Sequence, residues 1–162
     1  RRVGLIATAA SVRSGAYQRN LRQLDPDIAV TAKACPLFVP LVENGRFRRG
    51  DVVIETVARE YLEPLRREGL DTLILGCTHY PLLTDIIGDI MGPGVTLINT
   101  GEEAAWELKR TLRGLDLLAP EGPAGRATLC ASDQPEHFGS LAAYFLGESL
   151  TRPVQPVDID RY

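Results

Sequence analysis

The stretch Leu73–Leu83 places a cysteine and a histidine two residues apart, directly after an apolar run. Cys77 and His79 stand in the sequence Gly-Cys-Thr-His-Tyr-Pro, in a chain that holds only three cysteines and two histidines. A thiol has an ordinary pKa of about 8.5, so a neighbouring imidazole can share its proton near neutral pH. The spacing indicates a thiol that acts as a base or a nucleophile.

A structural interpretation of Cys77 stays open beside the chemical one, because a cysteine after an apolar strand is often a small buried hydrophobic residue. Gly76, Thr78 and Pro81 favour chemistry, since the end of a core strand has no need of proton-handling groups at a tight turn. A helix is expected to begin near Pro81, and its N-terminus would favour a thiolate at Cys77.

The remaining cysteines and the second histidine are expected to be structural. Cys35 and Cys130 are read as core or near-core thiols, and His137 as a surface residue. An odd number of cysteines at unrelated spacings predicts neither a disulfide framework nor a paired zinc site. No metal site is therefore expected.

Two further strand ends carry polar groups. Thr8 and Ser11 follow the first apolar run and offer hydroxyls that suit a carboxylate or phosphate, although helix capping explains Ser11 equally well. Glu43 ends the segment Cys-Pro-Leu-Phe-Val-Pro-Leu-Val, which its two prolines are expected to hold extended. The Glu43 carboxylate fits either a solvated loop or the orientation of a histidine.

Short apolar runs alternate with segments of helical period, which predicts an α/β fold with a parallel sheet. The expected strands are Arg2–Ala7, Ala29–Ala34, Asp71–Gly76, Gly94–Ile98 and Arg126–Ala131. Helices are expected over 11–24, 51–68, 82–91, 102–112 and 133–147, with Pro64 kinking or shortening the second of these.

Composition narrows the class of protein. With 44% hydrophobic and 24% charged residues and no long run of either, the chain resembles neither a disordered tail nor a membrane protein. A net charge of −3 and the lack of a concentrated basic patch argue against direct binding of nucleic acid. No signal-peptide pattern occurs, so a cytoplasmic protein is expected.

Three of these stretches, in this order and spacing, resemble the glutamate racemase family. They are Leu-Ile-Leu-Gly-Cys-Thr-His-Tyr-Pro, Lys-Ala-Cys-Pro-Leu-Phe-Val-Pro-Leu-Val-Glu-Asn-Gly, and Val-Gly-Leu-Ile-Ala-Thr-Ala-Ala-Ser-Val-Arg-Ser-Gly-Ala-Tyr. The related aspartate and hydantoin racemases share the Gly-Cys-Thr turn but not the His-Tyr-Pro after it. The resemblance implies interconversion of L- and D-glutamate without a cofactor, which supplies D-glutamate for peptidoglycan.

The resemblance also implies a role for each candidate residue. Cys77 would be the second of two thiols that flank the substrate Cα, the one that deprotonates L-glutamate. His79 would tune that thiol and Glu43 would assist the histidine. Thr78, Thr8 and Ser11 would contact the substrate, although the family more often has threonine at the position of Ser11.

The family motifs that carry the first thiol and the first acidic residue do not occur in these 162 residues. By resemblance, residues 1–99 form a complete second lobe and residues 100–162 form part of a first lobe, so the chain is expected to be an incomplete piece that does not racemise glutamate alone. A homodimer of the complete enzyme and binding to DNA gyrase are further family expectations. Two alternatives stay open: a one-thiol decarboxylase or isomerase of a small dicarboxylic acid, and a non-catalytic fragment that binds a partner.

Overall fold

The computed structural model describes residues 1–120, 122, 125, 127–147, 150 and 152–161. These form two compact units, Arg1–Leu118 and Ala119–Tyr162. The predicted division into lobes after residue 99 refers to the family and stays a prediction.

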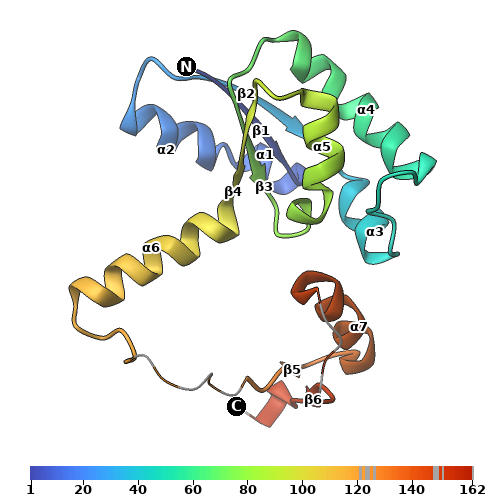
Figure 1. The fold of residues 1–162 in the computed structure, drawn as a ribbon, viewed down its shortest axis with the longest axis vertical. Coiled ribbons are helices and arrows are strands. Elements are labelled where there is room, and N and C mark those ends of the chain that lie inside the picture. Colours follow the sequence, from blue (N-terminus) through green and yellow to red (C-terminus); the bar gives the residue numbers. More distant parts are fainter. Residues whose placement is uncertain (121, 123–124, 126, 148–149, 151, 162) are drawn as a thin grey trace. The chain divides into compact units, whose positions relative to one another are not determined.

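A four-stranded, fully parallel sheet forms the centre of the first unit (Figure 1), in the order β2-β1-β3-β4. The strands are β1 (Arg2–Ala7), β2 (Ala29–Ala34), β3 (Thr72–Gly76) and β4 (Thr96–Asn99). The α/β parallel-sheet class is thus confirmed. The first two strands have the predicted bounds, while β3 and β4 begin one and two residues later than predicted.

Helices cover both faces of this sheet (Figure 1), with α1 and α2 on one side and α4 and α5 on the other. The helices of the first unit are α1 (Ala9–Ser14), α2 (Ala16–Leu24), α3 (Phe38–Glu43), α4 (Val52–Arg67), α5 (Thr84–Met91) and α6 (Thr100–Gly114), with a 3₁₀ turn η1 (Tyr80–Leu83) before α5. Apolar side chains of α4 and α5 meet those of β3 to form the core, which includes Ile54, Leu62, Leu73, Leu75 and Ile87.

Each helix boundary has a local cause. Gly15 adopts φ +63° and separates α1 from α2, so the single helix expected over 11–24 is two helices. Asp51 caps α4 by accepting the Val53 N–H at 3.0 Å. Helix α4 continues through Pro64 to Arg67, so the expected shortening does not occur. Pro64 is exposed, which lets water satisfy the carbonyl that its missing N–H leaves unpaired.

The segment after Cys35 is helical rather than extended, which corrects the sequence expectation. Pro40 lies in the first turn of α3, where a backbone N–H has no partner within the helix and proline is tolerated. Phe38 and Val42 are four residues apart and both buried, so one face of α3 packs into the core. The loop from α3 to α4 is held by Arg49, which forms two hydrogen bonds to Asp89 of α5.

The second unit contains a small parallel pair, β5 (Cys130–Ala131) with β6 (Gln155–Pro156), helix α7 (Pro135–Leu146) and a 3₁₀ turn η2 (Ile159–Arg161). The strand predicted over Arg126–Ala131 is reduced to its last two residues, and Arg126 lies outside the described residues. Helix α7 begins at Pro135, two residues after the expected cap Asp133. Cys130 is exposed, not near the core as expected, because β5 is too short to carry a buried face.

Candidate active site

The carboxyl ends of the four parallel strands meet at one edge of the sheet, and the candidate residues follow them. Ala7 of β1 is paired with Ala34 of β2 and with Gly76 of β3. The residues that directly follow these three strands therefore lie at the same edge of the sheet. They are Thr8, Cys35 and Cys77. Ligands of parallel α/β folds gather at this edge.

His79 joins two predicted site residues that lie far apart in the sequence. Its Nε2 is 3.1 Å from Glu43 Oε1, and its Nδ1 is 3.8 Å from Cys77 Sγ. The side chain of His79 is 20% exposed and that of Glu43 is 39% exposed. Glu43 belongs to α3 and the other two residues to the turn after β3, so the contact depends on the packing of α3 against that turn.

The hydrogen bond to Glu43 determines the tautomer of the neutral His79 ring, and thereby whether the nitrogen that faces the Cys77 sulfur carries a lone pair. An ionised carboxylate can only accept hydrogen bonds, so Nε2 of His79 donates to Glu43. In the neutral imidazole Nδ1 is then the acceptor, in position to take a proton from the Cys77 thiol. Thr78 Oγ1 also lies 3.4 Å from Nδ1 and can donate to it.

Thr8 and Ser11 lie at the end of β1. Thr8 caps α1 by accepting the Ser11 N–H at 3.3 Å, and the two hydroxyl oxygens are 3.0 Å apart. Thr8, not Ser11, is thus the capping residue. Both side chains are partly exposed, and the pairing of Ala7 with Gly76 puts Thr8 beside Cys77 in the register.

A 3₁₀ turn separates Cys77 from the following helix, which corrects one electrostatic expectation. Helix α5 begins at Thr84, not near Pro81, and η1 occupies the residues between. Because the field of a helix N-terminus falls off within about one turn, α5 contributes little at Cys77. The thiol instead contacts the imidazole of His79, which in turn lies near the Thr78 hydroxyl.

Cys35 follows β2, on the other side of β1 from β3, and cannot share the role of Cys77. Its side chain is fully buried, and its thiol lies 3.8 Å from the carbonyl oxygen of Lys33. Burial raises the pKa of the Cys35 thiol to about 12, with a smaller opposing effect of Lys33. Cys35 is thus a core thiol, as predicted.

Sequence reasoning did not anticipate the part played by Tyr80. This residue is fully buried directly below the turn, and its hydroxyl donates to the Cys35 carbonyl at 3.1 Å. The only sequence signal is its place between His79 and Pro81, and no local rule connects a tyrosine with a carbonyl 45 residues earlier.

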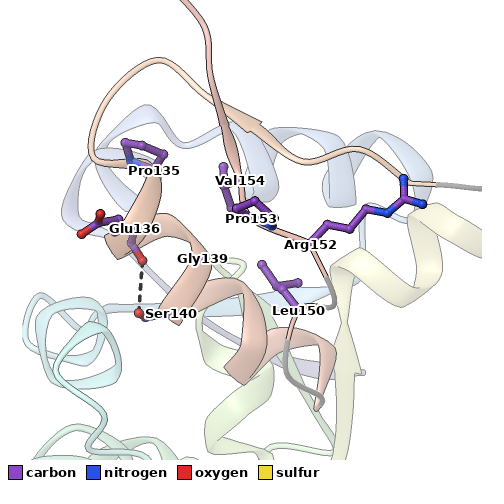
Figure 2. Close-up of a pocket in the computed structure, with 8 residues that line it drawn as sticks. All are labelled: Pro135, Glu136, Gly139, Ser140, Leu150, Arg152, Pro153 and Val154. Carbon is purple, nitrogen blue, oxygen red and sulfur yellow. Dashed lines mark hydrogen bonds between the residues drawn. The ribbon is translucent and has the colours of Figure 1, made fainter.

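The described residues contain no group of three His, Cys, Asp or Glu side chains that could hold a metal ion. Nor is any helix in the described parts long and apolar enough to cross a membrane. A groove of about 590 Å³ lies in the second unit (Figure 2), where α7 faces Leu150 and residues 152–154. Its lining includes Glu136, Gly139 and Arg152 but none of the predicted site residues.

Comparison with known proteins identifies the family. The sequence model of Asp/Glu/Hydantoin racemases matches residues 1–108, which include every candidate residue described above. The chain belongs to the Asp/Glu/hydantoin racemase family. Its resemblance to glutamate racemases, expected from the three motifs, is also confirmed by individual relatives.

Two such relatives are similar over nearly the whole length of this chain. A glutamate racemase of Geobacter metallireducens is 43% identical over 149 residues, which cover 92% of this chain and 54% of the relative. One of Mycobacterium ulcerans is 46% identical over 158 residues, covering 96% of this chain and 57% of the relative. The chain thus spans somewhat more than half the length of these relatives.

Solved structures of the family agree with this racemase fold. A glutamate racemase of Francisella tularensis, in complex with D-glutamate, has a TM-score of 0.86 at 32% identity and covers 99% of this chain and 59% of its own. One of Thermus thermophilus, in complex with beta-chloro-D-alanine, has a TM-score of 0.84 at 46% identity. The match covers 100% of this chain and 58% of the Thermus thermophilus chain.

Proposed function

We propose that these residues form one proton-transferring side of a glutamate racemase, which interconverts L- and D-glutamate without a cofactor. The observation that carries the proposal is the continuous contact from Glu43 through His79 to Cys77. Family membership supports it, as do relatives that are named glutamate racemase at 43% and 46% identity. The structure of one relative with D-glutamate supports the choice of substrate.

In this proposal the Cys77 thiolate removes the α-proton of L-glutamate. The S–H bond forms as the Cα–H bond breaks, and the electron pair left on Cα is delocalised into the substrate carboxyl group. A second thiol then gives a proton to the opposite face of Cα, which yields D-glutamate. The proton on Cys77 passes to Nδ1 of His79, whose Nε2–H remains bonded to Glu43.

Hydroxyl groups at the same edge of the sheet suit the rest of the substrate. Thr8, Ser11 and Thr78 offer hydrogen bonds to carboxylate or amino groups, and we assign them to substrate binding. The supply of D-glutamate for peptidoglycan, a homodimeric assembly and binding to DNA gyrase stay predictions from the family resemblance.

The second thiol of this mechanism is not Cys35, which is buried, with a pKa raised to about 12. Racemisation needs a base on one face of Cα and an acid on the other. The motifs that the resemblance assigns to the first thiol do not occur among these residues, so we expect that the 162-residue chain alone does not interconvert the enantiomers.

The test follows the Cα proton of L- and D-glutamate separately by NMR in D₂O, for the protein purified from its own cells and for the 162-residue chain. In the protein from its own cells both enantiomers should exchange and interconvert. Cys77→Ala should slow interconversion about 10²- to 10⁴-fold, the usual contribution of a positioned acid or base. Cys130→Ala is the matched control and should leave the rate unchanged.

Two results would contradict the proposal. Interconversion that survives Cys77→Ala unchanged would remove Cys77 from the chemistry. Loss of carbon dioxide from a small dicarboxylic acid, with no inversion of glutamate, would favour the one-thiol alternative instead.

A further inference from the structure

Tyr80 lies directly under the turn that carries Cys77 and His79. It is the residue after His79, its side chain is fully buried, and its backbone N–H closes the turn on the Cys77 carbonyl at 3.2 Å. A side chain in this position does not reach solvent and does not meet a substrate. Any effect of Tyr80 on the chemistry must therefore act through its neighbours.

Two contacts of the Tyr80 side chain are at the beginning of α3. Its ring meets the ring of Phe38 edge-on, with centroids 5.2 Å apart and planes at 88°. Its hydroxyl donates to the Cys35 carbonyl at 3.1 Å, and the same carbonyl accepts the Phe38 N–H at 3.3 Å. Tyr80 thus contacts Phe38, the first residue of α3, and the Cys35 carbonyl, which accepts the first hydrogen bond of this helix.

Helix α3 and the turn are connected at two points. Tyr80 joins them at the start of α3, and the hydrogen bond between Glu43 and His79 joins them at its end. Because α3 is only six residues long, a displacement of its start is transmitted to Glu43. We propose that Tyr80 is a positioning residue, whose hydroxyl on the Cys35 carbonyl sets the approach of Glu43 to His79 and thereby the proton transfer at Cys77.

The inference concerns the hydroxyl rather than the ring. A phenylalanine would fill the same space and keep the contact with Phe38. The Cys35 carbonyl would keep its bond from the Phe38 N–H, so the loss of one hydrogen bond should leave the fold intact. Burial, above all, raises the pKa of Tyr80, so its hydroxyl stays protonated and remains a donor at every working pH.

The experiment compares Tyr80→Phe with the unchanged 162-residue chain. The rate at which iodoacetamide alkylates Cys77 near neutral pH is measured by mass spectrometry that resolves each cysteine. This rate reports how readily the thiol gives up its proton. We expect it to fall about three- to tenfold, which lies within the range of couplings between neighbouring groups.

A double-mutant cycle separates positioning from a general structural effect. If Tyr80 acts by placing Glu43 against His79, Tyr80→Phe should cause no further loss in a chain that already carries Glu43→Gln. Nitrogen NMR of the imidazoles gives a second readout, since the chain has only two histidines and His137→Gln assigns the signals. The unchanged chain should show His79 protonated at Nε2, and Tyr80→Phe should show a mixture of the two tautomers.

Tyr17→Phe is the control, because it also removes one tyrosine hydroxyl but lies in α2, which covers the face of the sheet opposite to α4 and α5. It should leave the Cys77 rate within experimental error. Cys35 should stay protected and Cys130 should react at an unchanged rate in every variant, which shows that the fold is retained.

The inference rests on the proposed function, and the outcomes distinguish the two. If His79→Gln and Glu43→Gln leave the Cys77 rate unchanged, the proposed proton transfer itself fails. If those variants slow alkylation but Tyr80→Phe does not, only the role of Tyr80 is refuted. An equal loss in Tyr17→Phe would refute it as well, and so would an additive loss from Tyr80→Phe in the Glu43→Gln background.

Discussion

Cys77 and Cys35 are thiols that follow the two strands on either side of β1, at the same edge of the sheet, yet their surroundings are opposite. Cys77 is partly exposed and has an imidazole nitrogen 3.8 Å from its sulfur. Cys35 is fully buried beside a backbone carbonyl, and burial raises the pKa of its thiol to about 12. Chemistry at this edge therefore depends on what surrounds each residue and not on its place after a strand.

This difference predicts how the three cysteines react. At pH 9 iodoacetamide should modify Cys130 and Cys77 within minutes and Cys35 only after unfolding, because the buried thiol is neutral and inaccessible. Mass spectrometry of the digested chain measures each site, and addition of urea should abolish the protection of Cys35. Equal reaction of Cys35 and Cys130 in the folded chain would contradict the buried environment described here.

At the scale of elements, the position of Cys77 depends on the close approach of β1 and β3. Gly76 precedes the cysteine, and a Cβ at this position would lie 2.8 Å from Leu5 Cδ1, 3.0 Å from the Ile6 carbonyl oxygen and 3.1 Å from Ala7 Cβ. Contacts this short are not tolerated without movement, and the backbone of β1 cannot move away easily. The φ angle of Gly76 is not positive, so the backbone conformation alone does not require glycine at this position. Glycine is needed because β1 and β3 lie too close together for a side chain here.

Gly76→Ala should accordingly destabilise the first unit by about 1–3 kcal/mol, the usual cost of overpacking a core. It should also slow alkylation of Cys77, because separation of β1 from β3 displaces the turn. Urea unfolding followed by circular dichroism gives the free energy of unfolding. Gly94→Ala is the control, since nothing lies within 4 Å of a Cβ there, and a similar loss in that variant would argue against the steric explanation.

At the scale of the whole molecule, the titratable groups of the first unit should make its stability depend on pH in both directions. Burial is the main cause that raises the pKa of Cys35, Tyr61 and Tyr80. Asp71 is exposed, and its pKa is lowered chiefly by the hydrogen bond from the Arg2 N–H at 2.9 Å and also by that from the Thr72 hydroxyl. The hydrogen bond between Arg2 and Asp71 joins the beginnings of β1 and β3.

The signs of these shifts predict a plateau of stability near neutral pH. A raised pKa means that folding favours the protonated form of Cys35, Tyr61 and Tyr80, so their contribution to stability is complete at neutral pH. The free energy of unfolding should fall above about pH 9, where the thiol and then the phenols ionise in the unfolded chain. The lowered value of Asp71 contributes stability above its ordinary pKa of 3.8, which is lost as the pH falls further. Urea unfolding from pH 3 to 11 measures both limbs.

Two variants test which groups cause the loss of stability at alkaline pH and at acid pH. Tyr80→Phe removes one buried phenol and should make the alkaline loss shallower. Asp71→Asn should lower stability at neutral pH and make the acid loss shallower. An acid limb that is unchanged in Asp71→Asn would mean that another carboxyl group is responsible.

Local signals in the sequence determined a large part of this protein. The sequence predicts β1 and β2 at their observed bounds, and β1 has the short, mainly apolar run of a strand buried in a parallel sheet. The Gly-Cys-Thr-His-Tyr-Pro turn and the motifs around Thr8 and Glu43 sufficed to suggest the family. Local signals failed at α3, where two prolines indicated an extended chain although the burial of Phe38 and Val42 favours a helix.

Only the tertiary structure decided which of these residues meet. Glu43 and His79 are 36 residues apart, and Tyr80 and Cys35 are 45 apart. Sequence position left Glu43 open between a solvated loop and a partner of a histidine. The packing of α3 against the turn after β3 brings its carboxylate to Nε2. Spacing along a chain determines periodicity and turns, whereas contacts at this distance depend on strand register and on which helix faces share a core.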